Sequence, residues 1–243
     1  MTTVVVPAGD RTPGPAGTVF RTCPATGLRI DLGAQRLIKV HAVASVVSLL
    51  IGAIAAVLVV LTRWQAVHLL PAVWFYRILG VHGMSMLIFF IIFFEMAVLI
   101  FASTVLLNAR NSAPKTSWAA FLLMVAGAVT VEAMMWMGRA DVLFTSYVPL
   151  HAEPTFYLGV ILFAVGALVT VGVFFANLVV ARREQTYRGS LPLVVYGAMT
   201  AAIIAVITLV HGAAIYIPTY LWSLGLMTVD PASCMSLPGV PRL

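Results

Sequence analysis

Long apolar stretches alternate with short polar connections along this chain, and the alternation predicts its architecture. A helix needs about 20 apolar residues to cross the hydrocarbon core of a membrane. Five stretches are long enough, at about 37–61, 71–107, 117–137, 155–180 and 191–222. We therefore expect an all-α membrane protein, with a five-helix transmembrane bundle inside residues 36–226. The second stretch is long for one crossing, so its helix is expected to tilt or to protrude.

The composition supports a membrane protein and excludes an ordinary soluble domain. Of the 243 residues, 62% are hydrophobic and 9% are charged, whereas roughly a quarter of a soluble domain is charged. Membrane lipid is therefore the expected surrounding of the bundle. Proline and glycine are frequent before the first span and at the end of the chain. From this we predict a flexible cytoplasmic tail at 1–35 and an unstructured outer tail at 227–243.

The basic residues predict the orientation, because loops rich in lysine and arginine stay on the cytoplasmic side. Of the 14 basic residues, four fall on the opposite side: Arg63, Arg77, Arg139 and Arg242. The others lie before the first span, after the second or after the fourth. The N-terminus is thus predicted to be cytoplasmic and the C-terminus outside. The basic residues form no continuous stripe, so nucleic acid is not an expected partner.

His82 is the principal candidate for a functional group, because a lone imidazole deep in a membrane helix is costly unless it binds something. It lies about eleven residues, or roughly 16 Å at 1.5 Å per residue, from the outer surface. Gly80 and Gly83 leave room beside it for a large flat ligand. Its neighbours at helical spacing form an apolar, partly aromatic wall that suits a porphyrin, whose iron is commonly held by an imidazole: Ile78, Leu79, Ser85, Met86, Phe89 and Phe93. Equally open is a histidine that only hydrogen-bonds to a neighbouring helix.

Three further ionisable residues lie within the spans. His211 is expected at the depth of His82, where it either shares a ligand or, as we prefer, hydrogen-bonds across a tight helix contact. Glu95 and Glu132 either relay protons or, as we prefer, bridge helices through hydrogen bonds.

The remaining candidate ligands have simpler explanations. His41 begins the first span at its cytoplasmic end and can reach the interface, while His68 and His151 are expected in solvated outer loops. Cys23 and Cys234 are predicted on opposite sides of the membrane, so they cannot pair. Neither cysteine has a second one at metal-ligand spacing, so no metal site is expected at either.

Several segments agree with one family in order, spacing and placement between the spans: Trp74–Phe75–Tyr76 leading into Val81–His82–Gly83, then Asp141–Leu150, then Trp222–Leu226 followed by Val229–Asp230–Pro231. With them, the chain from Arg36 to Pro231 resembles the catalytic subunit of the haem-copper terminal oxidases, specifically the B-family branch of cytochrome c oxidase subunit I. One proline of the family's Tyr-Pro-Pro-Leu stretch is replaced by Val148.

The resemblance implies a respiratory oxidase in the inner membrane of a prokaryote. Such an enzyme takes electrons from cytochrome c or a similar donor, reduces oxygen to water and pumps protons. His82 would be one axial ligand of the low-spin haem iron, and Tyr147 would lie in an outer loop near the haems. The second haem and the copper belong to the complete subunit. The implied partners are oxidase subunit II and the remaining part of subunit I.

The family's other ligands have no counterpart here, because no histidine follows His211. The copper ligands, the ligand of the second haem and the other axial ligand of the low-spin haem all belong to later helices. We therefore expect an N-terminal half that is not catalytically competent alone, from a truncated gene or, less simply, a split subunit. A nitric oxide reductase-related half is an alternative. So is a non-catalytic assembly or interaction subunit, which would use the small residues of the first span for close packing: Gly52, Ala53, Ala55 and Ala56.

Overall fold

The computed structural model describes residues 11–142 and 150–228, and within them five helices are long and apolar enough to cross a membrane. The first is α1 (Leu32–Arg63). The second span joins α2 (Ala72–Gly83), the π-helical η2 (Met84–Phe90), α3 (Ile91–Ile100) and the π-helical η3 (Phe101–Val105). The others are α4 (Pro114–Trp136), α5 (Pro154–Arg183) and α6 (Leu193–Ser223). This confirms the all-α membrane fold, with span ends within a few residues of those expected.

A small sheet precedes the helices, where a flexible tail was expected over residues 1–35. It consists of β1 (Arg11–Pro13), β2 (Val19–Thr22) and β3 (Arg29–Asp31) in antiparallel order, with the 3-10 turn η1 (Pro15–Gly17) between the first two. The sheet has a small apolar face, because Phe20 and Ile30 are buried. The prolines and glycines that indicated flexibility serve partly as turns, since Gly17 and Gly27 have positive φ angles of 73° and 69°. Residues 1–10 and most of the predicted outer tail lie outside the described residues.

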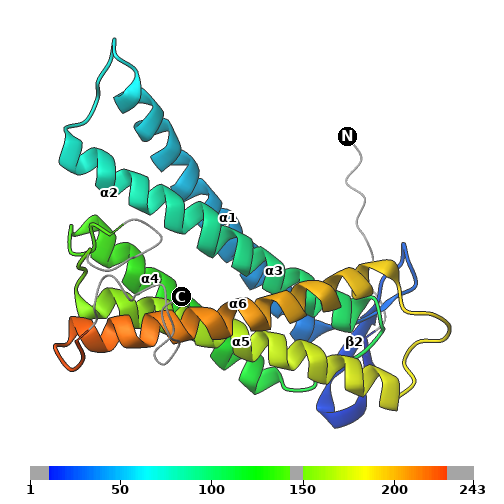
Figure 1. Ribbon diagram of the computed structural model, residues 1–243. Helices are drawn as coiled ribbons and strands as arrows, with labels where there is room; N and C mark the ends of the chain where they lie inside the picture. The colour runs from blue at the N-terminus through cyan, green and yellow to red at the C-terminus, as the bar shows by residue number, and fades with distance from the viewer. Residues whose placement is uncertain (1–10, 143–149, 229–243) are drawn as a thin grey trace.

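The helices divide into two groups that share one end. α1 packs along the second span, and α4 packs along α5, with α6 beside α5 (Figure 1). The sheet lies at the shared end, against α1 and η3. At the other end, the loop between α1 and α2 stands clear of α4, α5 and α6 (Figure 1). The first turn of α2 is accordingly exposed, so the long second span does protrude from its neighbours.

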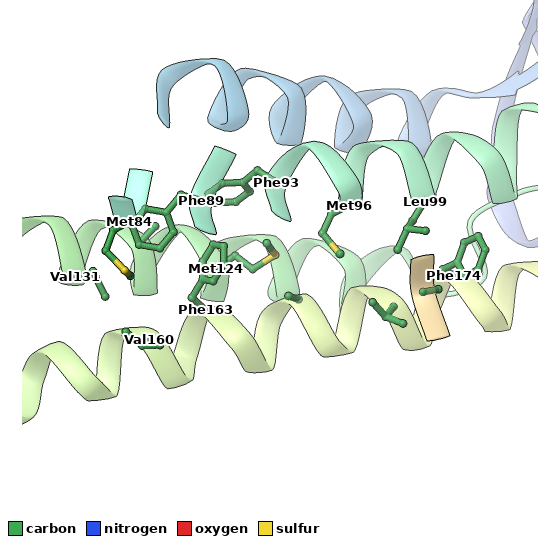
Figure 2. Close-up of a cluster of buried hydrophobic side chains, with 14 of the residues drawn as sticks. Met84, Phe89, Phe93, Met96, Leu99, Met124, Val131, Val160, Phe163 and Phe174 are labelled. Atoms are coloured by element: carbon green, nitrogen blue, oxygen red, sulfur yellow. The ribbon is translucent and has the colours of Figure 1, made fainter. Parts of the chain in front are cut away.

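Aromatic and sulfur-containing side chains fill the core between the second span, α4 and α5. Figure 2 shows Phe89 and Phe93 of the second span pointing toward Phe163 of α5, beside Met124 of α4. The ring centroids of Phe89 and Phe163 are 4.9 Å apart, and those of Phe93 and Phe163 are 5.3 Å apart. Both pairs cross edge to face, the arrangement that aromatic quadrupoles favour. This core fixes which side of the second span faces inward.

A buried polar network joins the elements at the sheet end. Asp31 is 4% exposed, and its carboxylate accepts the Asn111 N–H at 2.9 Å, from the loop before α4. The side chain of Asn111 donates to Ser117 of α4 at 2.9 Å. Asn177 of α5 accepts the Ser112 N–H at 2.8 Å. These bonds satisfy loop backbone groups that would otherwise be buried without partners.

Candidate functional site

His82 lies on α2 immediately before the π-helical segment, and its ring is held by α1. Its Nδ1 is 2.9 Å from the carbonyl oxygen of Gly52. A side chain at position 52 would collide with Met86, because an ideal Cβ there would lie well inside van der Waals distance of the Met86 Cγ and Sδ atoms. Gly52 therefore lets the two helices approach until the imidazole reaches the backbone of α1.

This hydrogen bond determines which ring nitrogen can bind a metal. A carbonyl oxygen only accepts, so Nδ1 carries the proton and Nε2 keeps its lone pair. Nε2 makes no hydrogen bond to the described residues, and it is not among the buried atoms that lack a partner. An imidazole held at Nδ1 by a backbone carbonyl, with Nε2 free, is the usual state of a metal-ligating histidine. His82 thus has the chemistry of an axial ligand to haem iron.

The predicted porphyrin-facing wall is only partly correct. Ile78, Phe89 and Phe93 are 3%, 1% and 2% exposed, so they face the core of the chain. Leu79 and Met86 stay partly exposed beside His82. Helical spacing alone did not predict this, because α4 and α5 pack against the face of η2 next to His82. The contact of Phe89 with Phe163 of α5 shows this packing. A flat ligand at Nε2 would therefore meet side chains on the outside of the chain.

Glu132 bridges the second span and α4, as we preferred from the sequence. The hydroxyl of Ser85 donates to Glu132 Oε1 at 2.5 Å, and Ser85 is fully buried. The second carboxyl oxygen, Oε2, is buried without a partner. Glu95, the other intramembrane carboxyl group, is half-buried and makes no side-chain hydrogen bond within the described residues.

The other end of η2 is bonded to α1. Ser45 donates to the carbonyl oxygen of Phe90 at 3.0 Å. π-Helical turns leave the regular ladder strained and often occur at functional sites, and this one begins two residues after His82. Sequence reasoning missed Ser45 and the acceptor role of Gly52. The signal available was a serine and a glycine in otherwise apolar turns of the first span.

Two other intramembrane histidines differ from expectation. His41 is fully buried instead of reaching the interface. It lies against Phe121, at 4.7 Å between ring centroids, with its Nδ1 2.9 Å from the Leu37 carbonyl and its Nε2 without a partner. His211 makes no bond across a helix contact: its Nδ1 lies 2.8 Å from Ile207 O on its own helix, and the residue is exposed.

The loops that hold His68 and His151 leave both histidines exposed, as expected, and an ion pair lies at the same end of the bundle. His68 and His151 are exposed, although the ring of His151 lies 4.9 Å from that of Trp222. Arg77 on α2 pairs with Asp141 at 3.2 Å, and its guanidinium lies over the ring of Trp74. The resemblance used residues 141–150, and Tyr147 with its neighbours at 143–149 lies outside the described residues.

No metal cluster forms from protein ligands alone in the described part of the chain. Nowhere in it do three His, Cys, Asp or Glu side chains converge. Cys23 is a free thiol, and the Thr26 hydroxyl lowers its pKa below the usual value; Cys234 lies outside the described residues. An apolar cavity of about 210 Å³ between the second span, α5 and α6 is lined by no His, Cys, Asp or Glu, and its walls include Met84, Ile88 and Leu209. A single imidazole, such as His82, suits a metal that brings its own ligands.

The chain is similar to known oxidase polypeptides in sequence and in fold. The family model described as "Cytochrome C and Quinol oxidase polypeptide I" matches residues 36–238. The chain is also similar to a solved heme-copper terminal oxidase dimer, with a TM-score of 0.74 and 26% sequence identity. That match covers 84% of this chain and 36% of the solved chain, so this chain spans about a third of its length. No curated protein matches the chain.

Proposed function

Because the chain belongs to the cytochrome c and quinol oxidase polypeptide I family, we propose that it forms part of the catalytic subunit of a respiratory haem-copper oxidase. His82 would be the residue of this chain that ligates the low-spin haem iron. The observation that carries this assignment is the contact of His82 Nδ1 with Gly52 O at 2.9 Å, which leaves Nε2 with its lone pair. When bound, the haem supplies one-electron redox chemistry, and the protein holds and tunes it.

The complete enzyme reduces oxygen to water with electrons from cytochrome c, as a B-family member in a prokaryotic inner membrane. Its second haem and its copper are held outside this chain, on the remaining part of subunit I, and subunit II is a further partner. Two observations support this division. The described residues offer no three-ligand metal cluster, and the solved oxidase chain is about three times longer than the part matched here. By itself this chain is not catalytically competent.

The N-terminus is cytoplasmic in this proposal. The sheet, the start of α1, the loop before α4 and the end of α5 share one end of the bundle (Figure 1). The basic residues of these segments therefore gather at that end, as the positive-inside rule requires. They are Arg11, Arg21, Arg29, Arg36, Lys39, Arg110, Lys115, Arg182, Arg183 and Arg188.

The exposed face of α6 supports further helices beside this chain. His211 lies about midway along α6 and is exposed. An imidazole facing lipid at that depth is costly. The cost is avoided when the remaining part of subunit I covers this face.

His82→Ala tests the function directly. The variant and the parent are produced with their partner polypeptides, and the low-spin haem is measured by absorption spectroscopy and by haem content per chain. We expect the low-spin haem signal to be lost in His82→Ala. Among the described imidazoles inside the spans, only that of His82 is held by a carbonyl of another helix, whereas His41 and His211 bond to carbonyl oxygens of their own helices. His68→Ala, at an exposed loop histidine, is the control and should keep the signal. An unchanged low-spin signal in His82→Ala would overturn the assignment.

A further inference from the structure

A chain of contacts leads from Glu132 on α4 to the ring of His82, and it assigns Glu132 a role in the site. We propose that Glu132 is a positioning residue for the haem ligand, acting through Ser85 and the backbone of Gly52. The inference deepens the proposed function and rests on it.

The first link is the hydrogen bond from Ser85 to Glu132. It is 2.5 Å long, and Ser85 is fully buried, so water does not compete for the serine hydroxyl. Ser85 follows His82 by three residues, and thus lies one turn further along the same span. Its hydroxyl bonds to another helix rather than back to its own, the usual partner of a serine within a helix. Glu132 thereby fixes the first turn of η2 relative to α4.

The second link is the packing of Ser85 against Gly52. An ideal Cβ at position 52 would lie 3.2 Å from the Cβ of Ser85, which is tighter than ordinary contact. The side chains of Met86 and Ser85 both face Gly52, Met86 more closely, and together they limit how closely this point of α1 can approach the second span. The same residue, Gly52, supplies the carbonyl oxygen that receives the His82 Nδ1–H at 2.9 Å. A shift of Ser85 consequently moves the acceptor that orients the imidazole.

The far end of η2 prevents the segment from absorbing such a shift freely. Ser45, two turns before Gly52 on α1, donates to the Phe90 carbonyl at 3.0 Å. The π-helical segment is thus bonded to α1 at its end and to α4 near its beginning. Among the described residues, the Ser85–Glu132 bond is the one side-chain hydrogen bond between α4 and the second span. Removing it releases the only polar constraint on that side of the segment.

The decisive comparison separates the geometry of this bond from the charge of the carboxyl group. Glu132→Gln keeps a carbonyl oxygen that can accept from Ser85, whereas Glu132→Ala removes the acceptor. Ser85→Ala removes the donor while leaving Glu132 in place, and it is small enough to keep the packing against Gly52. Glu95→Gln is the matched control, because Glu95 is a half-buried carboxyl group of the second span with no side-chain hydrogen bond to a described residue.

The readout is the electron paramagnetic resonance signal of the oxidised low-spin haem, measured in the assembled enzyme together with haem content. This signal depends on the orientation of the axial imidazole, as outer-shell partners set it. We expect the signal to shift and broaden in Glu132→Ala and Ser85→Ala. In Glu132→Gln and Glu95→Gln it should match the parent. A merely structural role would lower the yield without moving the signal of the protein that assembles.

Two outcomes overturn the inference. One is a parent-like signal in both Glu132→Ala and Ser85→Ala, and the other is a shift in Glu132→Gln as large as in Glu132→Ala. If Glu132→Ala fails to assemble, Ser85→Ala alone decides. His82→Ala distinguishes the two levels of the proposal. If His82→Ala loses the low-spin haem while Ser85→Ala keeps the parent signal, only the positioning role is rejected. If His82→Ala retains that haem, the ligand assignment itself is rejected.

Discussion

The α4–α5 pair and α6 use glycine in opposite ways. A Cβ at Gly127 of α4 would lie 2.5 Å from the Gly159 carbonyl oxygen and 2.6 Å from the Phe163 nitrogen, both backbone atoms of α5. Gly166 of α5 meets the backbone of α4 in the same way. At Gly197 and Gly212 of α6, by contrast, an added Cβ meets no described atom within 4 Å.

The difference shows that small residues indicate close helix packing only where this chain itself supplies the partner. Half of the most apolar window of α5 is buried, against 17% of that of α6. Helices in a membrane associate through close van der Waals contact between small residues. α4 and α5, which lie side by side in Figure 1, make such contact at Gly127, Gly159 and Gly166. The equivalent sites on α6 are open, and Gly212 borders the cavity between the second span, α5 and α6.

Gly127→Ala should produce the largest loss of stability. The new methyl group meets backbone atoms, which cannot rotate away as a side chain could, so α4 and α5 must separate locally. Overpacking of this kind typically costs about 1–3 kcal/mol, and we expect the upper end here. Gly172→Ala on α5 is the control, because its Cβ would meet nothing within 4 Å. Thermal unfolding in detergent, followed by tryptophan fluorescence, should show a lower midpoint for Gly127→Ala and an unchanged midpoint for the control. Equal midpoints would contradict the close contact.

Asn177→Ala should have the next largest effect, because α5 is also bonded at the sheet end. Asn177 is fully buried, accepts the Ser112 N–H at 2.8 Å and donates to Ser103 at 3.2 Å. Its loss leaves buried polar groups unpaired, at a cost of about 2 kcal/mol. The control on α6 is Thr200→Ala, whose hydroxyl bonds only to Tyr196 O of its own helix. The same unfolding assay should separate the two, and a shift of similar size in the control would show that α6 is not the less constrained helix.

The spans were predictable from the sequence, because the membrane requires long apolar helices and their backbone bonds are internal to each segment. The sheet over Arg11–Asp31 was not. Its strands are three or four residues long, and their stability comes from contacts distant in sequence, such as the Arg29 N–H bonded to Asn108 at 2.8 Å. Local proline and glycine content cannot reveal such contacts.

The site divides in the same way. His82 could be identified because an ionisable group inside an apolar run is rare and costly. Its surroundings could not, because regular helical spacing does not say which face the other helices cover, and Phe89 and Phe93 face inward. His41 was misplaced for a related reason: depth was counted along one helix, whereas Phe121 of α4 buries the ring from the side.

Gly212→Ala should have the smallest effect, and it tests the open side of the comparison. The Cβ would enter space that no described atom of this chain fills. The free energy of unfolding should therefore change by less than about 0.5 kcal/mol, as for substitutions away from packed features. The neighbouring His211 does not line the cavity that Gly212 borders, and it is exposed. A loss as large as that of Gly127→Ala would mean that α6 is already closely packed by the chain itself. In that case the glycines of α5 and α6 would differ only in which partner they contact.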